Sequence, residues 1–123
     1  MRVGIDLVAV ASVEEAIEAH GDHYLTRIYT EHELADCRVD GTVDAERLAG
    51  RFAAKEAAMK TLRPGEEAVV PWSSIAVHRR ASGWVELELS GPAADLAEQA
   101  GIADMSVSLT HERGFAAAVV VAT

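Results

Sequence analysis

The chain has 123 residues, of which half are hydrophobic and only 5% are aromatic, and its formal net charge is −9. This length suits one hydrophobic core, so we expect a single domain over residues 1–123. Because nucleic acids and anionic membranes are bound through basic surfaces, the charge argues against both as partners. The single cysteine cannot form an intramolecular disulfide. No stretch resembles a signal peptide or has the roughly 20 apolar residues of a membrane helix, so we expect a cytoplasmic protein.

The hydrophobic pattern and the turn residues predict a strand, then helices, two strands, a helix and two strands. In chain order these are a strand at 3–10, helices at 12–19, from 30, and at 44–62, strands at 74–80 and 84–89, a helix at 91–100, and strands at 106–110 and 115–122. Ser12 with Glu15, and Thr30 with Glu33, have the spacing of a capping box at a helix start. This order predicts a mixed α+β domain.

The longest predicted helix carries a glutamate within its apolar stripe. At about 100° per residue, Leu48, Phe52 and Met59 share one stripe, and Glu56 projects inside it. A carboxylate directed towards a core is costly unless it is paired or bound to a metal ion. An ordinary ion pair with Lys60, one turn later, is the simpler interpretation and is worth only a few tenths of a kcal/mol.

Asp6 is a second unusual carboxylate, because it interrupts an otherwise apolar strand that is predicted to be buried. Backbone N–H groups at the strand end would satisfy it in the simpler interpretation. Two inward carboxylates in one small domain repel each other, and a divalent cation relieves that repulsion. Mg²⁺ suits such a pair, since it takes one or two carboxylates and also binds substrate phosphates.

Taken together, four segments resemble the holo-acyl-carrier-protein-synthase family. They are Gly4-Ile-Asp6, Tyr24-Leu-Thr-Arg27-Ile-Tyr-Thr-Glu-His-Glu-Leu34, Arg51-Phe-Ala-Ala-Lys55-Glu56-Ala-Ala-Met-Lys60, and Ser108-Leu-Thr-His111-Glu112. The helix with the Lys-Glu-Ala-x-x-Lys pattern is the most specific of these, whereas the Gly-Ile-Asp fragment alone is weak. The resemblance spans nearly the whole chain in order, and it implies a long helix packed on a small, mainly antiparallel sheet.

The resemblance implies a phosphopantetheinyl transferase, which moves the 4′-phosphopantetheine arm of coenzyme A to a serine of an acyl or peptidyl carrier protein. It implies that Asp6 and Glu56 bind Mg²⁺ and that Asp6, Glu56 and Lys60 are the catalytic residues. The residues implied at coenzyme A are Arg51, Lys55, Lys60, Gly65 and His111. Family members are trimers, so a homotrimer is expected in which His111 serves a site whose metal ligands come from another chain. Glu56, or a water that it orients, is the expected proton acceptor.

The chain departs from the family pattern at its first helix. Ala9 and Ser12 stand where the family carries a glutamate and a basic residue, and no lysine or arginine occurs from Val3 to Thr26. The family docks its acidic carrier there, and an acidic helix would slow the approach of such a partner. Three interpretations follow: a transferase for a less acidic carrier, a synthase that docks acidic carriers through other basic residues, and an altered member that binds coenzyme A or a nucleotide, or acts only as an assembly partner.

Overall fold

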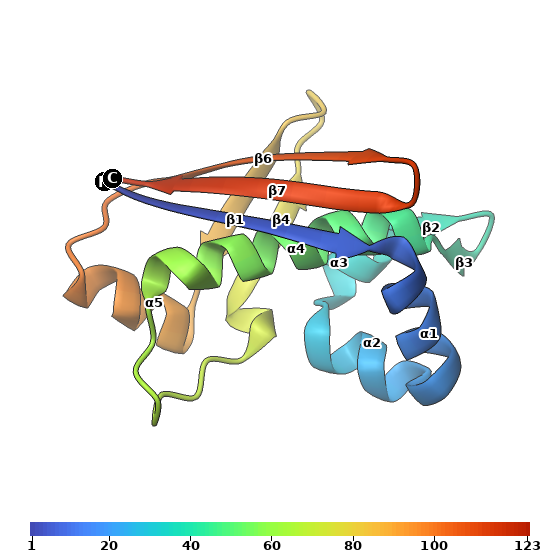
Figure 1. The fold of residues 1–123 in the computed structure, drawn as a ribbon, viewed down its shortest axis with the longest axis horizontal. Helices are drawn as coiled ribbons and strands as arrows, with labels where there is room; N and C mark the ends of the chain where they lie inside the picture. Colours follow the sequence, from blue (N-terminus) through green and yellow to red (C-terminus); the bar gives the residue numbers. More distant parts are fainter.

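The computed structural model describes residues 1–123 and has a long central helix with strands and short helices around it (Figure 1). In chain order the elements are β1 (Arg2–Ala9), α1 (Val10–His20), α2 (Asp22–Ile28), α3 (Glu31–Asp36), β2 (Arg38–Val39), β3 (Thr42–Val43), α4 (Ala45–Leu62), the 3-10 helix η1 (Trp72–Ser74), β4 (Ile75–Arg79), β5 (Val85–Leu89), α5 (Gly91–Gln99), β6 (Met105–Glu112) and β7 (Phe115–Ala122). This arrangement confirms the predicted α+β fold.

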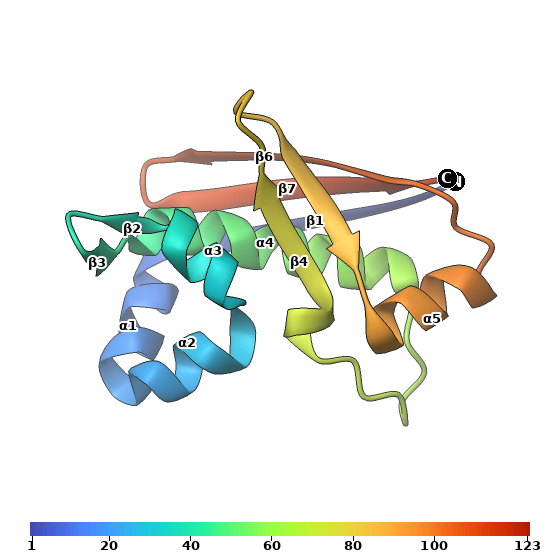
Figure 2. The same ribbon diagram turned by 180° about the vertical axis from the view of Figure 1, so that it is seen from behind.

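Strand β7 lies at the centre of the main sheet, antiparallel to β1 on one side and to β6 on the other. Helix α4 runs along the inner face of this sheet. The β4–β5 hairpin crosses the side of α4 that faces away from β1, as Figure 2 shows from behind. Helices α1, α2 and α3 gather near one end of α4, and α5 lies near the other end. The two chain termini lie side by side, since Arg2 pairs with Ala122.

Small residues let β1 approach α4 very closely. Ala53, Ala54, Ala57 and Ala58 of α4 are fully buried. Gly4 of β1 lies so near the helix that a Cβ atom there would overlap the carbonyl oxygen of Ala57. The glycine is therefore required by packing rather than by its backbone conformation, and it fixes the position of β1 against α4.

Most predicted elements are present, and one predicted start is wrong. The capping box of Thr30 and Glu33 is confirmed, with both reciprocal hydrogen bonds formed. Helix α1, in contrast, begins at Val10 with Ala9 as its N-cap and no side-chain cap, so Ser12 lies within the helix. Val10 and Val13 are both buried. Because burial of this apolar face stabilises the helix, α1 begins two residues before the start that the polar pattern predicts. Helix α2 and the short β2–β3 hairpin were not predicted.

The outer face of the main sheet is hydrophobic and exposed. Val3, Ile5 and Leu7 of β1 are 62%, 66% and 66% exposed, so β1 is buried on one face only, which contradicts the prediction of a strand buried on both faces. Phe115 and Val119 of β7 lie on the same outer face through their pairing with Ala9 and Ile5. A sheet face of this kind is typical of a surface that another protein covers. No helix in the structure has both the length and the apolar character needed to span a membrane.

Candidate active site

Strand β1 and helix α4 bring together three of the predicted residues. The Lys60 ammonium donates to the Ile5 carbonyl oxygen at 2.8 Å and to Asp6 Oδ1 at 3.2 Å. The Asp6 side chain is only 11% exposed, and its Oδ2 atom is buried without a hydrogen-bond donor. Backbone N–H groups therefore do not satisfy Asp6, and the simple Glu56–Lys60 ion pair is replaced by the pair between Lys60 and Asp6.

Glu56 faces the same place from α4. Burial raises the pKa of Glu56, the negative charge of Asp6 and a hydrogen bond to Asp6 raise it further, and the positive charge of Lys60 opposes the shift. Two carboxylates thus share one small volume, and one buried oxygen has no donor. Such a pair fits a divalent cation, because the metal charge removes the repulsion between the carboxylates. The unpartnered oxygen would then coordinate the cation.

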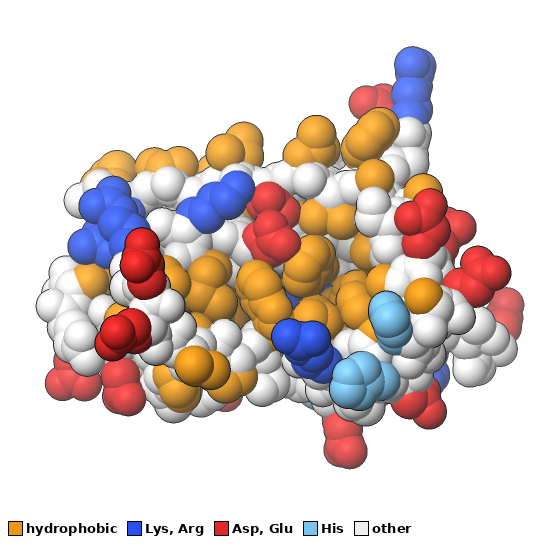
Figure 3. Space-filling model, turned by 60° about the horizontal axis from the view of Figure 1, so that its bottom comes forward, with side chains coloured by type: hydrophobic (Ala, Val, Ile, Leu, Met, Phe, Trp, Pro, Cys, Tyr) orange, Lys and Arg blue, Asp and Glu red, His pale blue; other side chains and the backbone are white.

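Glu56 lines an open hollow rather than the core, which corrects the prediction from the helix projection. The hollow has a volume of about 360 Å³, and its lining residues are Glu56, Met59, Lys60, Arg63, Pro64 and Trp72. Phe52 does not line the hollow but contacts Trp72, which does. The two ring centroids are 5.3 Å apart in an edge-to-face arrangement. Acidic side chains lie beside a hollow lined with hydrophobic side chains in Figure 3, with basic side chains close by.

A second hollow is basic and contains two of the predicted coenzyme A residues, Arg51 and His111. Its charged lining residues are Glu46, Arg47, Arg51, Arg79 and His111. Arg51 is only 6% exposed, yet its Nε and Nη2 atoms have no hydrogen-bond partner. A buried guanidinium without a partner is costly, so this hollow is built for an anion. His111 is half exposed here and lies 3.2 Å from Glu46.

One chain does not bring the two hollows together. They share no lining residue. Arg51 lies five residues before Glu56, which at about 100° per residue places the two side chains about 140° apart around α4. The structure therefore unites Asp6, Glu56 and Lys60 in one place and Arg51 and His111 in another.

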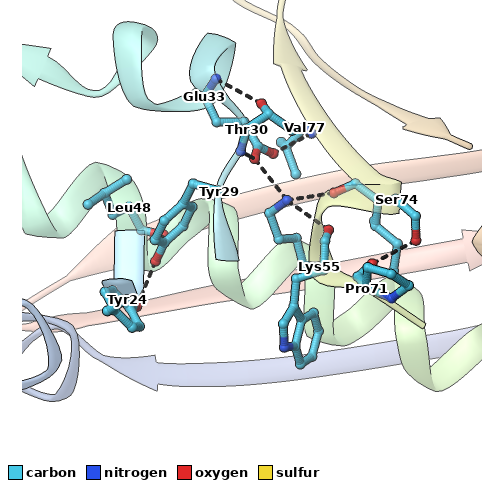
Figure 4. A network of polar contacts seen from close by, with 11 residues as sticks. Tyr24, Tyr29, Thr30, Glu33, Leu48, Lys55, Pro71, Ser74 and Val77 are labelled. Carbon is cyan, nitrogen blue, oxygen red and sulfur yellow. Dashed lines mark hydrogen bonds and ion pairs between the residues drawn. The ribbon is translucent and has the colours of Figure 1, made fainter. Parts of the chain in front are cut away.

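Two further predicted residues lie outside both hollows. Lys55 is completely buried, and its ammonium contacts Glu33 Oε1 at 2.8 Å and the carbonyl oxygens of Trp72 and Ile75 at 3.1 and 2.7 Å (Figure 4). All three of its N–H donors are used within the protein, so the Lys55 ammonium has no donor free for coenzyme A in this structure. Gly65 is exposed in the turn after Pro64 and does not line the first hollow.

Several residues of the two hollows were not predicted as site residues. They are Met59, Arg63, Pro64 and Trp72 in the first hollow, and Glu46, Arg47 and Arg79 in the second. Met59 lies in the apolar stripe of α4 beside Glu56, so its position was open to prediction. Trp72 comes from a segment whose course after α4 has no sequence signal.

Comparison with solved structures identifies the class of this protein. The chain matches the Helicobacter pylori holo-[acyl-carrier-protein] synthase, solved in complex with coenzyme A, with a TM-score of 0.83 and 28% identity over 99% of this chain and 100% of that one. It matches the Neisseria meningitidis enzyme with a TM-score of 0.85 and 28% identity over 98% and 96%. Both are holo-[acyl-carrier-protein] synthases, so the fold is that of a phosphopantetheinyl transferase.

Sequence comparison then gives the family. A model described as the 4′-phosphopantetheinyl transferase superfamily matches residues 2–120. A holo-[acyl-carrier-protein] synthase of Gloeobacter violaceus is 42% identical over 97% of this chain and 89% of its own. The chain therefore belongs to the holo-[acyl-carrier-protein] synthase type of this superfamily, which confirms the predicted family and enzyme class.

Proposed function

We propose that this chain transfers the 4′-phosphopantetheine arm of coenzyme A to a serine of an acyl carrier protein. The observation that carries the proposal is the Asp6–Glu56 carboxylate pair beside Lys60, on a fold whose Helicobacter pylori member was solved with coenzyme A. The relatives are holo-[acyl-carrier-protein] synthases and give no support to a non-standard carrier, so an acyl carrier protein is the proposed acceptor.

The reaction needs positioning and charge neutralisation more than covalent catalysis. The serine hydroxyl oxygen attacks the phosphorus that carries the pantetheine arm, and the bond from that phosphorus to the oxygen of 3′,5′-ADP breaks. The serine proton passes to Glu56 or to a water that Glu56 orients. Lys60, 54% exposed next to Asp6, is placed to stabilise the negative charge that moves onto the leaving group.

A divalent cation fits the carboxylate pair. Asp6 and Glu56 would hold it, because their charges repel each other and the Oδ2 atom of Asp6 has no donor. Mg²⁺ is the ion that we propose, since it binds one or two carboxylates together with substrate phosphates. When bound, it would neutralise part of the charge of the pyrophosphate.

The proposed transfer is tested by the mass of a carrier protein. The purified chain is incubated with an unmodified acyl carrier protein, coenzyme A and Mg²⁺, and the carrier is then weighed by mass spectrometry. A gain equal to one phosphopantetheine group, lost when the acceptor serine is replaced by alanine, is the expected result. Coenzyme A binding without any gain on acyl carrier proteins from the same genome would contradict the proposal and leave only a binding role.

We further propose that the complete donor site forms between copies of the chain in a homotrimer. The basic hollow of Arg51 and His111 would receive the 3′-phosphate of a coenzyme A molecule whose pyrophosphate lies at Glu56 of another copy. Two features of the single chain support this: the hollows face different sides of α4, and the outer face of the main sheet is hydrophobic and exposed. A second copy, covering the β1 and β7 side chains of that face, would bury the apolar area.

Replacing Ile5 with lysine is expected to break the oligomer, because it places a charge in the middle of the exposed apolar face. Thr26→Lys, which adds the same charge on exposed helix α2, is the matched control and is expected to keep the oligomer. Sedimentation or light scattering gives the mass of each variant. An unchanged oligomer in Ile5→Lys, or a monomeric parent protein, would refute the proposed interface.

The acidic first helix gives a separate prediction on carrier docking. Ser12 is exposed on α1, between Val3 and Thr26 where no lysine or arginine occurs. Ser12→Arg is expected to lower the KM for an acidic carrier several-fold at low salt, with the gain lost at high salt, because the added charge attracts the carrier electrostatically. Ser12→Gln controls for side-chain size. If Ser12→Arg and Ser12→Gln have the same carrier KM at low salt, the charge of α1 does not limit docking.

A further inference from the structure

Lys55 and Glu33 form a fully buried ion pair next to the proposed active site. Glu33 comes from α3 and is as completely buried as Lys55. Its Oε1 atom also accepts from the Thr30 N–H at 2.7 Å, and its Oε2 atom accepts from the Val77 N–H at 2.7 Å. The pair and its backbone partners thus join α3, α4, η1 and β4, as Figure 4 shows.

This pair has no free group with which to touch a substrate. The Lys55 ammonium has three donors and three acceptors around it, and the Glu33 carboxylate accepts three hydrogen bonds in all. Burial lowers the pKa of Lys55, and the charge of Glu33 opposes that shift. A closed network of this kind places backbone segments, and it takes no direct part in the reaction.

The segment that the network places is the wall of the first hollow. Lys55 donates to the carbonyl oxygen of Trp72, and Trp72 lines the same hollow as Glu56. The residue after Lys55 is Glu56 itself, about 100° further around α4. One side chain therefore links the helix that carries the carboxylate to the backbone of another residue that lines the hollow.

The wall has few other ties to α4. The turn before it is exposed from Gly65 to Val69 and makes one backbone hydrogen bond of its own, from Ala68 to Gly65. Ser74 bonds back to Pro71, and its carbonyl oxygen accepts from the Ser90 N–H at 2.9 Å, but neither bond connects η1 to α4. The edge-to-face contact of Trp72 with Phe52 remains, and it holds the ring but not the backbone.

We infer that Lys55 and Glu33 are positioning residues that hold Trp72 in the lining of the hollow that Glu56 also lines, and so keep the hollow open for the organic part of the coenzyme A donor. The inference rests on the proposed transferase function. Loss of the pair lets the segment around Trp72 move. This weakens the binding of coenzyme A more than it lowers the rate of transfer in the bound complex, and it leaves carrier binding unchanged.

The first measurement needs no substrate. The chain has two tryptophans, so Trp84→Phe, at a position that is 76% exposed, leaves Trp72 as the only one. In this background Lys55→Met is expected to increase acrylamide quenching of Trp72 and to lower its fluorescence anisotropy. Val13→Ala, a core change in α1 that leaves the network intact, is the control for lost stability and is expected to keep both signals.

The second measurement is steady-state transfer by the same variants. Lys55→Met is expected to raise the KM for coenzyme A about tenfold, with a smaller change in kcat and none in the carrier KM. In a Trp72→Ala background the same substitution is expected to add little, because the indole that the network positions is already absent. If Lys55→Met does not fold, Glu33→Gln, which keeps the side-chain volume, takes its place in both measurements.

The two readouts separate the inference from the function on which it rests. A parent protein that modifies no carrier would refute the transferase, while the Trp72 signals would still report whether the pair holds the wall. A folded variant whose Trp72 quenching and coenzyme A KM equal those of Val13→Ala would overturn the positioning role. An equal effect of Lys55→Met with and without Trp72 would overturn it as well.

Discussion

Replacing Glu56 with glutamine is expected to lower transfer by at least about a thousandfold and, at neutral pH, to make the metal-free protein more stable. The two effects share one cause. Glu56 lies beside Asp6, where burial and the second carboxylate raise its pKa, so the ionised pair is unfavourable until something neutralises it. Glutamine removes the repulsion, and with it the charge that the proposed site uses.

The sign of the stability change depends on pH. Because the pKa of Glu56 is higher in the folded than in the unfolded chain, the folded state holds the proton more tightly. Below the unfolded pKa both states are protonated, and Glu56→Gln is expected to match the parent. As pH rises from there through the raised pKa, the parent loses stability that the variant keeps.

Thermal melts in a chelator across this pH range, together with the transfer assay, check both effects. Glu67→Gln makes the same chemical change in the exposed turn after α4 and is expected to leave activity and stability unchanged. A Glu56→Gln variant that retains activity would remove Glu56 from the site. One that is less stable than the parent at neutral pH would show that the carboxylate pair is not under strain.

Replacing Gly4 with alanine is expected to cost about 3 kcal/mol or more of stability, although it adds a single methyl group. The new Cβ atom would overlap the backbone of Ala57, and neither a strand in the sheet nor an alanine-packed helix can yield easily. For a chain of this size the loss corresponds to a fall in Tm of about 10 °C or more. Transfer is expected to fall too, because β1 carries Asp6 to Glu56 and Lys60.

Gly65→Ala is the matched control for this change. It is the same substitution in an exposed turn, where nothing lies within 4 Å of the added atom. Denaturant unfolding gives the free energy of each variant. If Gly4→Ala and Gly65→Ala have equal stabilities, the close approach of β1 to α4 does not constrain the fold.

The elements that were predicted well have signals within their own residues. The Thr30–Glu33 capping box, the long helix before Pro64 and the final strand pair follow from local chemistry. The start of α1 was wrong because its apolar face begins at Val10, two residues before the polar pattern that looks like a cap. The exposure of the outer face of β1 is not predictable, because the sequence shows apolar residues but not which face another element covers.

The site could be predicted only where the helix period was informative. Glu56 and Lys60 share a side of α4, and the close packing allowed by Gly4 brings Asp6 to them. The link of Lys55 to coenzyme A rests on the family resemblance alone. Its partner Glu33 lies 22 positions earlier, and in the sequence it shows only a capping function. The turn after α4 has no periodicity, so the wall formed by Trp72 was not predictable.

A mixture of two inactive variants tests most directly whether transfer needs Glu56 of one copy and Arg51 of another. Glu56→Gln and Arg51→Met are unfolded together, refolded as mixed oligomers and weighed by native mass spectrometry. Each variant alone is expected to be inactive. If random mixed trimers form, about a quarter of the interfaces join an intact Glu56 to an intact Arg51, and transfer to the carrier is expected to return to that fraction of the parent rate. Mixed oligomers that form but show no transfer would contradict a site shared between copies.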